Sequence, residues 1–160
     1  MCKYPDKPFI TILSSNLSGN RLGRALVIAD CLKDDYHVTI IGMLRKRAVL
    51  WKAAEDYSGA EILPVRYLPP PLYAISIISA LLKIKGDTVI AVKPLFSSFG
   101  IGLLAKLLLK KKLVVDIDDN EIALMTYGKT FTHKYLNLNP DRLIPALILQ
   151  KFIKYSDAVT

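Results

Sequence analysis

Short apolar runs alternate along this chain with longer stretches of helical periodicity. Between residues 21 and 33, apolar side chains recur at intervals of three and four residues, which indicates one face of a helix. The short runs are apolar on both faces, which is typical of strands that helices cover from both sides. We expect strands at residues 9–13, 37–41, 61–65, 87–92 and 113–117. We expect helices at residues 21–33, 49–57, 72–84, 99–109 and 141–154.

The alternation of strands and helices predicts βαβ units and a parallel sheet, an α/β fold of the Rossmann-like kind. Residues 1–160 contain no internal repeat and no linker that would divide them, so we expect a single domain. Residues 156–160 resemble a turn that enters a sixth strand, and the sequence stops inside it. We therefore expect a truncated domain, the first half of a larger protein. Residues 122–140 fit equally a mobile loop over a site or an ordinary connection.

The composition excludes an intrinsically disordered chain, because 52% of the 160 residues are hydrophobic and 22% are charged. The formal net charge of +8 favours anionic partners, namely nucleic acid, acidic lipid or phosphorylated ligands. The chain carries no nucleic-acid-binding motif, so we do not expect a nucleic acid partner. With only two cysteines, the sequence does not indicate a disulfide framework. It favours a reducing cytoplasm, and we expect Cys31 to be a buried thiol.

Lysines gather where the third and fourth predicted helices end, at Lys83, Lys85 and residues 110–112. There they favour the negative ends of the helices, and peripheral contact with an acidic membrane surface is the alternative. The longest apolar stretches are too short to span a bilayer. We therefore expect a cytoplasmic protein, with the inner face of the membrane as the alternative location.

The loops that follow the predicted strands differ from those that precede them. Residues 14–20, 42–47, 93–98 and 118–121 are rich in polar or small side chains, whereas the opposite loops are mostly lysine. Because ligands of an open parallel sheet bind beyond the carboxyl ends of its strands, this asymmetry predicts a cleft at that edge.

The loop at residues 14–20 is polar and opens the first predicted helix, whose N-terminal amides suit an anion. It matches neither the G-x-G-x-x-G pattern nor a P-loop. An ordinary βα turn with Ser18 or Asn20 as the helix cap explains it equally well. Arg45, after the second strand, is a candidate for a ligand phosphate, and a solvated loop is the alternative.

An acidic cluster is the sharpest local feature and comprises Asp116, Asp118, Asp119 and Glu121. Its carboxylates suit the recognition of sugar hydroxyls, since they accept hydrogen bonds. We expect no metal here, because no histidine lies nearby and no calcium-loop glycine pattern occurs. Lys93, at the end of the fourth strand, either faces the cleft or forms an ion pair with the acidic loop, and both roles are compatible. His37 and His133 have no serine or cysteine at motif spacing, so no catalytic triad is indicated.

Three segments resemble the N-terminal half of GT-B glycosyltransferases of the large retaining, family-4-like group. They are ITILSSN at residues 10–16, VKPLFSSFGIG at 92–102 and VVDIDDNE at 114–121. The last is similar to a D-x-D-D-x-E segment of some of these enzymes, in which tryptophan often precedes the glutamate; here Asn120 does. The resemblance implies that the cleft residues are Asn16, Ser18, Gly19, Arg45, Lys93, Ser97, Asp118, Asp119 and Glu121.

The resemblance further implies transfer of a sugar from a nucleotide-sugar donor to a glycan, a lipid-linked or a small-molecule acceptor. In this family the acceptor binds mainly the N-terminal domain, and the donor binds the C-terminal domain. The family's E-x7-E signature lies in that second domain, and no such pair occurs here. We therefore expect no cofactor on this chain, a C-terminal domain or partner subunit elsewhere, and no transfer by residues 1–160 alone. The alternatives are a stand-alone nucleotide-binding module and a basic peripheral membrane or interaction protein without catalysis.

Overall fold

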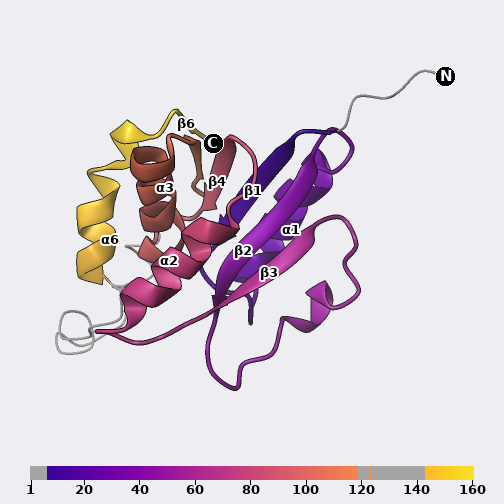
Figure 1. The fold of residues 1–160 in the computed structure, drawn as a ribbon, viewed down its shortest axis with the longest axis horizontal. Helices are drawn as coiled ribbons and strands as arrows, with labels where there is room; N and C mark the ends of the chain where they lie inside the picture. The colour runs from indigo at the N-terminus through magenta and orange to yellow at the C-terminus, as the bar shows by residue number, and fades with distance from the viewer. Residues whose placement is uncertain (1–6, 119–122, 124–142) are drawn as a thin grey trace.

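The computed structural model describes residues 7–118, 123 and 143–160, and they form a six-stranded parallel sheet with helices on both faces (Figure 1). The strands lie in the order β3-β2-β1-β4-β5-β6, the order of the Rossmann fold. The predicted fold class is therefore confirmed. The strands are β1 (Phe9–Ser14), β2 (His37–Leu44), β3 (Glu61–Arg66), β4 (Thr88–Val92), β5 (Lys112–Asp116) and β6 (Ala158–Val159). The helices and helical turns are α1 (Arg21–Leu32), η1 (Lys52–Ala54), α2 (Tyr73–Lys83), η2 (Phe96–Gly100), α3 (Ile101–Leu109), α6 (Leu143–Gln150) and η3 (Ile153–Tyr155).

Two apolar cores flank the sheet, because its central strands are apolar on both faces. Ile12 and Ile40 pack against α1 on one face, and both are completely buried. Phe99 and Leu113 belong to the core on the opposite face, under α2, α3 and α6. This two-sided burial explains why the strands read as continuous apolar runs rather than as alternating patterns.

The start of β4 is fixed beside β1 by a hydroxyl and a glycine. Thr11 is fully buried in β1, and its Oγ1 both donates to the carbonyl of Lys85 (2.8 Å) and accepts from its amide (2.9 Å). Gly86 follows with φ of +74°, and a Cβ there would lie 1.8 Å from the carbonyl oxygen of Phe9. Only glycine fits this close approach, which brings the chain from α2 into β4 next to β1.

Four details differ from the expectations. The helix expected at residues 49–57 is only the short turn η1, since Glu55 and Asp56 at its C-terminal end would oppose the negative end of a helix. Asn20 occupies the N-cap position of α1, but no side chain donates or accepts a capping hydrogen bond there. The helix expected from residue 99 begins at Ile101, after the π-helical turn η2. Cys31 is exposed rather than buried.

The sixth strand predicted from residues 156–160 is present as β6, which pairs with β5. The carboxylate of Asp157 accepts the amide of Leu113 at 2.7 Å and contacts the ammonium of Lys106 at 2.5 Å. Asp157 therefore holds the last strand to both β5 and α3. The start of the last predicted helix, at residues 139–141, lies outside the described residues. Within the described part of the chain, every helix is too short or too polar to cross a bilayer.

Candidate functional site

The connections from β1 and β4 leave the sheet toward opposite faces. The two strands are parallel neighbours, with Ile10 beside Thr88 and Leu13 beside Ala91. The chain after β1 enters α1 on one face, and the chain after β4 enters η2 and α3 on the other. Such a switch point is where open α/β sheets bind ligands, so the loops at residues 14–20 and 93–98 define the candidate site.

The loop after β1 is shaped by its own side chains. The Oδ1 atom of Asn16 accepts hydrogen bonds from the amide of Ser18 (3.0 Å) and from its hydroxyl (2.9 Å). Leu17 is completely buried, and its amide donates to the carbonyl of Met43 at 3.0 Å. Gly19 faces open space, because a Cβ there would meet nothing within 4 Å. The predicted residues Asn16 and Ser18 are thus brought together, and their side chains are hydrogen-bonded to each other.

Lys93 ends β4 with a backbone conformation that is unusual for lysine. Its φ is +70°, and only 8% of the residue is exposed. The turn is held by two hydrogen bonds, from the amide of Lys93 to the carbonyl of Asp116 (2.9 Å) and from the hydroxyl of Ser98 to the carbonyl of Lys93 (2.8 Å). A non-glycine residue in the left-handed region costs about 1–2 kcal/mol. Strain of this kind, held by surrounding structure, is typical of functional sites.

The ammonium of Lys93 lies 3.3 Å from a carboxylate oxygen of Asp118. The Lys93 side chain is 10% exposed and that of Asp118 is 28% exposed. Lys93 is therefore largely buried, whereas its partner Asp118 reaches the solvent-exposed surface. This confirms the predicted ion pair between the end of β4 and the acidic segment. Asp119 and Glu121 lie outside the described residues, and their predicted roles are not tested.

Two serines join the loops of the switch point. The hydroxyl of Ser97 donates to the carbonyl of Ser15 at 3.2 Å, which ties η2 to the end of β1. Ser15 is only 4% exposed, and its hydroxyl has no hydrogen-bond partner among the described residues. Leaving a buried hydroxyl unpaired costs about 1–3 kcal/mol. Ser15 was not among the predicted site residues, although it lies in the predicted loop.

The turn η2 is wider than an α-helical turn, because the amide of Gly100 donates to the carbonyl of Leu95 at 3.1 Å. π-helical turns of this kind occur frequently at functional sites. Here the turn places Ser97 against β1 and Ser98 beneath Lys93. Sequence periodicity could not reveal this, because it does not distinguish a π turn from the first turn of α3.

Asp116 belongs to a different interaction from Asp118. Its carboxylate is buried and receives two hydrogen bonds from Arg24 of α1, at 2.9 and 2.7 Å. The hydroxyl of Thr160 donates a third, at 3.2 Å. The hydrogen bond with Asp116 and its charge raise the pKa of the Arg24 guanidinium. The two described members of the acidic cluster therefore differ: Asp116 joins α1 to β5, whereas Asp118 faces Lys93.

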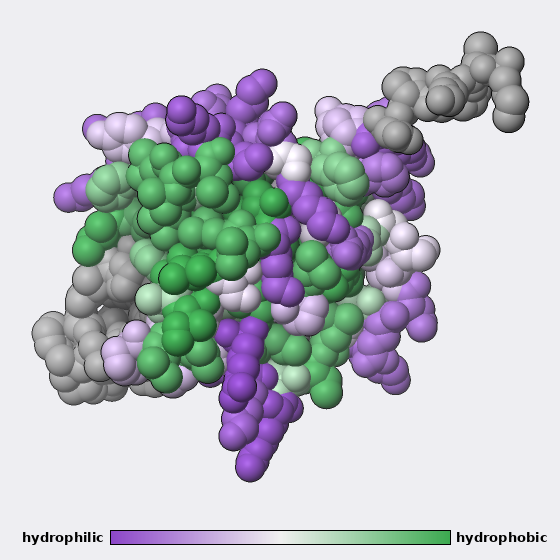
Figure 2. Space-filling view, viewed as in Figure 1, coloured by the Kyte–Doolittle hydropathy of each residue, from purple (hydrophilic) through white to green (hydrophobic). Residues whose placement is uncertain are grey.

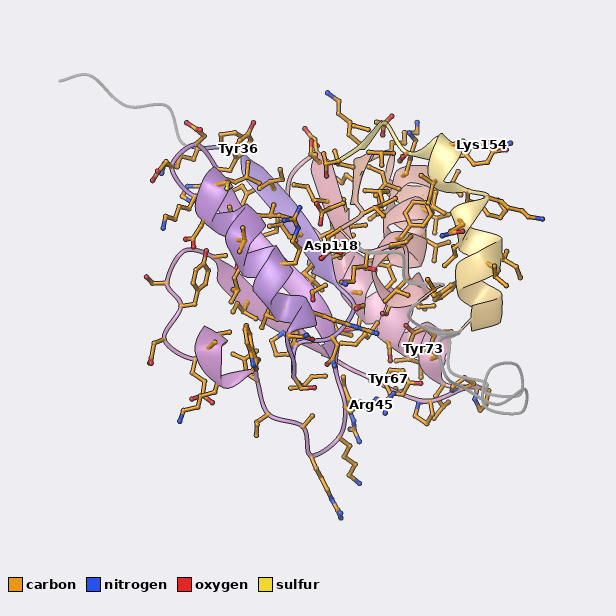
Figure 3. The ribbon with its side chains drawn as sticks, turned by 180° about the vertical axis from the view of Figure 1, so that it is seen from behind. Tyr36, Arg45, Tyr67, Tyr73, Asp118 and Lys154 are labelled. Atoms are coloured by element: carbon orange, nitrogen blue, oxygen red, sulfur yellow. The ribbon has the colours of Figure 1, made fainter. Side chains whose placement is uncertain are left out.

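Arg45 lies away from Asp118 (Figure 3). It follows β2, and its guanidinium stacks over the ring of Tyr67 at 5.3 Å from the centroid. The ring of Tyr67 in turn lies 5.5 Å from that of Tyr73. Arg45 is exposed, and its contact with a ligand phosphate stays a prediction.

A cavity of about 740 Å³ lies at the other edge of the sheet, beside the amino ends of β2 and β3. His37, Thr39, Tyr57 and Glu61 contribute to its wall. No motif or hydrophobic pattern of the sequence indicates this cavity. Within the described residues, no three histidine, cysteine or acidic side chains converge as metal ligands.

No family model matches the chain, and no curated protein matches it. Solved structures of similar fold include a wide-type short-chain dehydrogenase/reductase from Veillonella parvula DSM 2008 in complex with NADP. Its identity is 12% and its TM-score 0.51, with 96% of this chain and 67% of that chain covered. This likeness is one of fold and supports the Rossmann-like assignment.

Two UGT structures are also similar. UGT2 of Phytolacca americana, complexed with UDP-2-fluoro-glucose and pterostilbene, is 13% identical with a TM-score of 0.48, and the match covers 77% of this chain. UGT89C1 of Arabidopsis thaliana, complexed with UDP, is 10% identical with a TM-score of 0.43, and the match covers 96% of this chain. The matched region is 33% of the first UGT chain and 42% of the second.

Proposed function

We propose that this chain binds the acceptor of a sugar-transfer reaction, as one half of a GT-B glycosyltransferase of the retaining, family-4-like group. The acceptor would lie beyond the carboxyl ends of β1 and β4. The observation that carries the proposal is the paired Lys93 and Asp118 at the switch point, where the neighbouring strand β1 leads into a loop whose Ser15 hydroxyl has no partner among the described residues.

The chemistry of these groups suits a hydroxyl-bearing ligand. A carboxylate accepts hydrogen bonds, an ammonium donates them, and a serine hydroxyl does both. A sugar hydroxyl also both donates and accepts, so it can bridge an ion pair without disturbing its charge balance. A phosphate would favour an unbalanced positive site, whereas the charge of Lys93 is matched by Asp118.

The loop after β1 argues against the alternative of a stand-alone dinucleotide-binding module. Dinucleotide-binding loops use glycines so that the backbone can approach a pyrophosphate closely. Here Ser14, Ser15 and Asn16 occupy the end of the strand, and the hydroxyl of Ser14 donates to the carbonyl of Asn16 at 3.2 Å. The position after β2 does not decide between the two functions, because an arginine there, as Arg45 is here, would suit the 2′-phosphate of NADP.

The donor would be bound elsewhere. The resemblance assigns the nucleotide sugar to a C-terminal domain, which another part of a longer protein or a partner subunit would supply. We expect residues 1–160 alone to transfer no sugar. Turnover of UDP-glucose by the purified chain would contradict this division of labour.

The experiment is saturation-transfer NMR with two kinds of probe, a panel of methyl hexosides and NADPH. We expect signals from one or more hexosides with the wild-type chain, and none with Lys93→Met or Asp118→Asn. The matched controls are Lys85→Met and Glu61→Gln, which break an exposed ion pair of 2.7 Å and should leave the hexoside signal intact. Circular dichroism confirms that each variant is folded.

A signal from NADPH that depends on Lys93, without any hexoside signal, would favour the nucleotide-binding alternative and overturn the proposal. Equal loss of hexoside signal in the Lys85 and Lys93 variants would also contradict it, because the effect would then not arise at the switch point.

A further inference from the structure

An exposed apolar surface covers the outer side of α2, α3 and α6 (Figure 2). On α2 the exposed residues recur at intervals of three and four, which places them in one stripe on the helix. Soluble surfaces rarely expose a contiguous apolar patch of this kind unless it is an interaction site. The side chains that define this apolar face are Ile75, Ile78, Leu82, Leu107, Ile148 and Phe152.

Two side chains of the apolar face are largely exposed to solvent, and the face includes a groove. Leu82 is 82% exposed and Leu107 is 74% exposed, so neither contributes much to the core. Between α3 and α6, a groove of about 530 Å³ has a lining that is almost entirely apolar and includes Leu107 and Phe152. Leu82, Leu107 and Phe152 are therefore exposed enough to contact an apolar partner.

Lysines border the apolar face along one edge. Because α2, α3 and α6 all run opposite to the strands, they end at the amino edge of the sheet, where Figure 2 shows a hydrophilic rim. From residue 62 to residue 115 the chain has eight basic side chains and a single acid, Asp87. No described carboxylate forms an ion pair with the lysines that we call the lysine rim, namely Lys83, Lys110, Lys151 and Lys154.

We propose that the apolar face and the lysine rim together dock the protein on the surface of an anionic lipid bilayer. The apolar side chains would enter the boundary between headgroups and acyl chains, and the lysines would contact anionic headgroups. Charge complementarity selects this occupant. A second copy of the chain meeting through the same face would add a second lysine rim without matching acids, whereas acidic lipids neutralise the rim. The proposal does not depend on the ligand of the switch point.

The test is co-sedimentation of the full chain with vesicles of phosphatidylcholine and phosphatidylserine in a three-to-one ratio, compared with vesicles of phosphatidylcholine alone. We expect sedimentation with the anionic vesicles and much weaker sedimentation with the neutral ones. Each lysine near an anionic surface strengthens binding by about fivefold. The double variant Lys110→Gln/Lys151→Gln should therefore bind about 25-fold more weakly.

Two matched control variants distinguish binding through the apolar face and lysine rim from a general effect of charge or hydrophobicity. Lys46→Gln/Lys52→Gln removes two exposed lysines between β2 and β3 and should change binding by less than about twofold. Leu107→Asp should weaken binding by about tenfold or more, because a polar side chain would have to enter the lipid boundary. Val49→Asp changes an equally exposed residue, 75% exposed, outside the apolar face and should have little effect.

Failure of the wild-type chain to sediment with anionic vesicles would overturn the proposal. So would equal losses in the Leu107 and Val49 variants, or in the two lysine double variants. If analytical ultracentrifugation shows a dimer that Leu107→Asp converts to a monomer, while vesicles are not bound, the face is an interface between two copies. The proposal is then wrong.

Discussion

Arg24 of α1 and Asp116 of β5 are joined by two parallel hydrogen bonds between residues 92 positions apart in the chain. The Arg24 side chain is 41% exposed, whereas that of Asp116 is 3% exposed. A buried carboxylate is tolerated when it is paired and hydrogen-bonded, and Arg24 supplies both the charge and two donors. The pair therefore fastens α1 to the half of the sheet beyond the switch point.

Arg24→Met should destabilise the protein by about 2 kcal/mol, less than for a fully buried pair because Arg24 is partly exposed. The carboxylate of Asp116 would remain buried with the hydroxyl of Thr160 as its only described partner. Urea unfolding measures the change. Arg21→Met, on the same helix, removes an equal charge without touching Asp116 and should cost less than about 0.5 kcal/mol. Equal costs for the two variants would show that the pair is not the cause.

Lys110→Gly should stabilise the protein by about 1 kcal/mol. Lys110 ends α3 with φ of +55°, in the left-handed conformation that glycine adopts without steric cost. The cap hydrogen bond from its amide to the carbonyl of Ala105 does not use the side chain. Urea unfolding of the variant tests this, and a loss of stability would contradict the assigned conformation.

Asp157 should make stability depend on pH in the acidic range. The hydrogen bond from Lys106, and then that from the amide of Leu113, hold the pKa of Asp157 below its ordinary value of 3.8. Because the folded pKa is depressed, this stabilisation is present above pH 3.8 and is lost as pH falls through the folded pKa. Asp157→Asn should flatten the corresponding part of a plot of unfolding free energy against pH. An unchanged slope would contradict the role assigned to Asp157.

Tyr57 should add a pH dependence in the alkaline range. Burial, together with its hydrogen bond to Asp30, raises the pKa of Tyr57 from 10.0 to about 12. A raised pKa means that the stabilisation is present below pH 10 and is lost as pH rises toward 12. Tyr57→Phe should remove this decline in unfolding free energy. The difference in phenolate absorbance between the wild type and Tyr57→Phe isolates Tyr57 from the other tyrosines, and a difference that titrates near pH 10 would contradict the raised pKa.

The sequence pattern predicted the sheet because each of the first five strands is an apolar run that ends at polar or basic residues. The sequence pattern also predicted the helix α1, because its buried residues share one helical face. The helix expected at residues 49–57 was wrong. The spacing of apolar residues there fits a helical period, but the short turn η1 buries only Ala54. The order of the strands depends on the connection after β3, which crosses the sheet to place β4 beside β1. Local periodicity does not reveal such a crossover.

The candidate site was predicted only in part. The polar loops after β1 and β4 and the pair of Lys93 with Asp118 could be inferred, because parallel strands place these segments at one edge. The contact between Arg24 and Asp116 could not, since it depends on how α1 lies across the sheet. The unpaired hydroxyl of Ser15 could not either, because it depends on which neighbouring serine turns toward which carbonyl.

The central claim is that the switch point binds a sugar-bearing acceptor, and amide chemical-shift mapping with methyl hexosides tests it most directly. The account predicts that the amides that move lie at residues 14–18 and 93–98, at the ends of β1 and β4. Lys93→Met should abolish these shifts while leaving the rest of the spectrum unchanged. Shifts centred instead on the cavity beside His37 and Glu61, or shifts with NADPH alone, would contradict the claim.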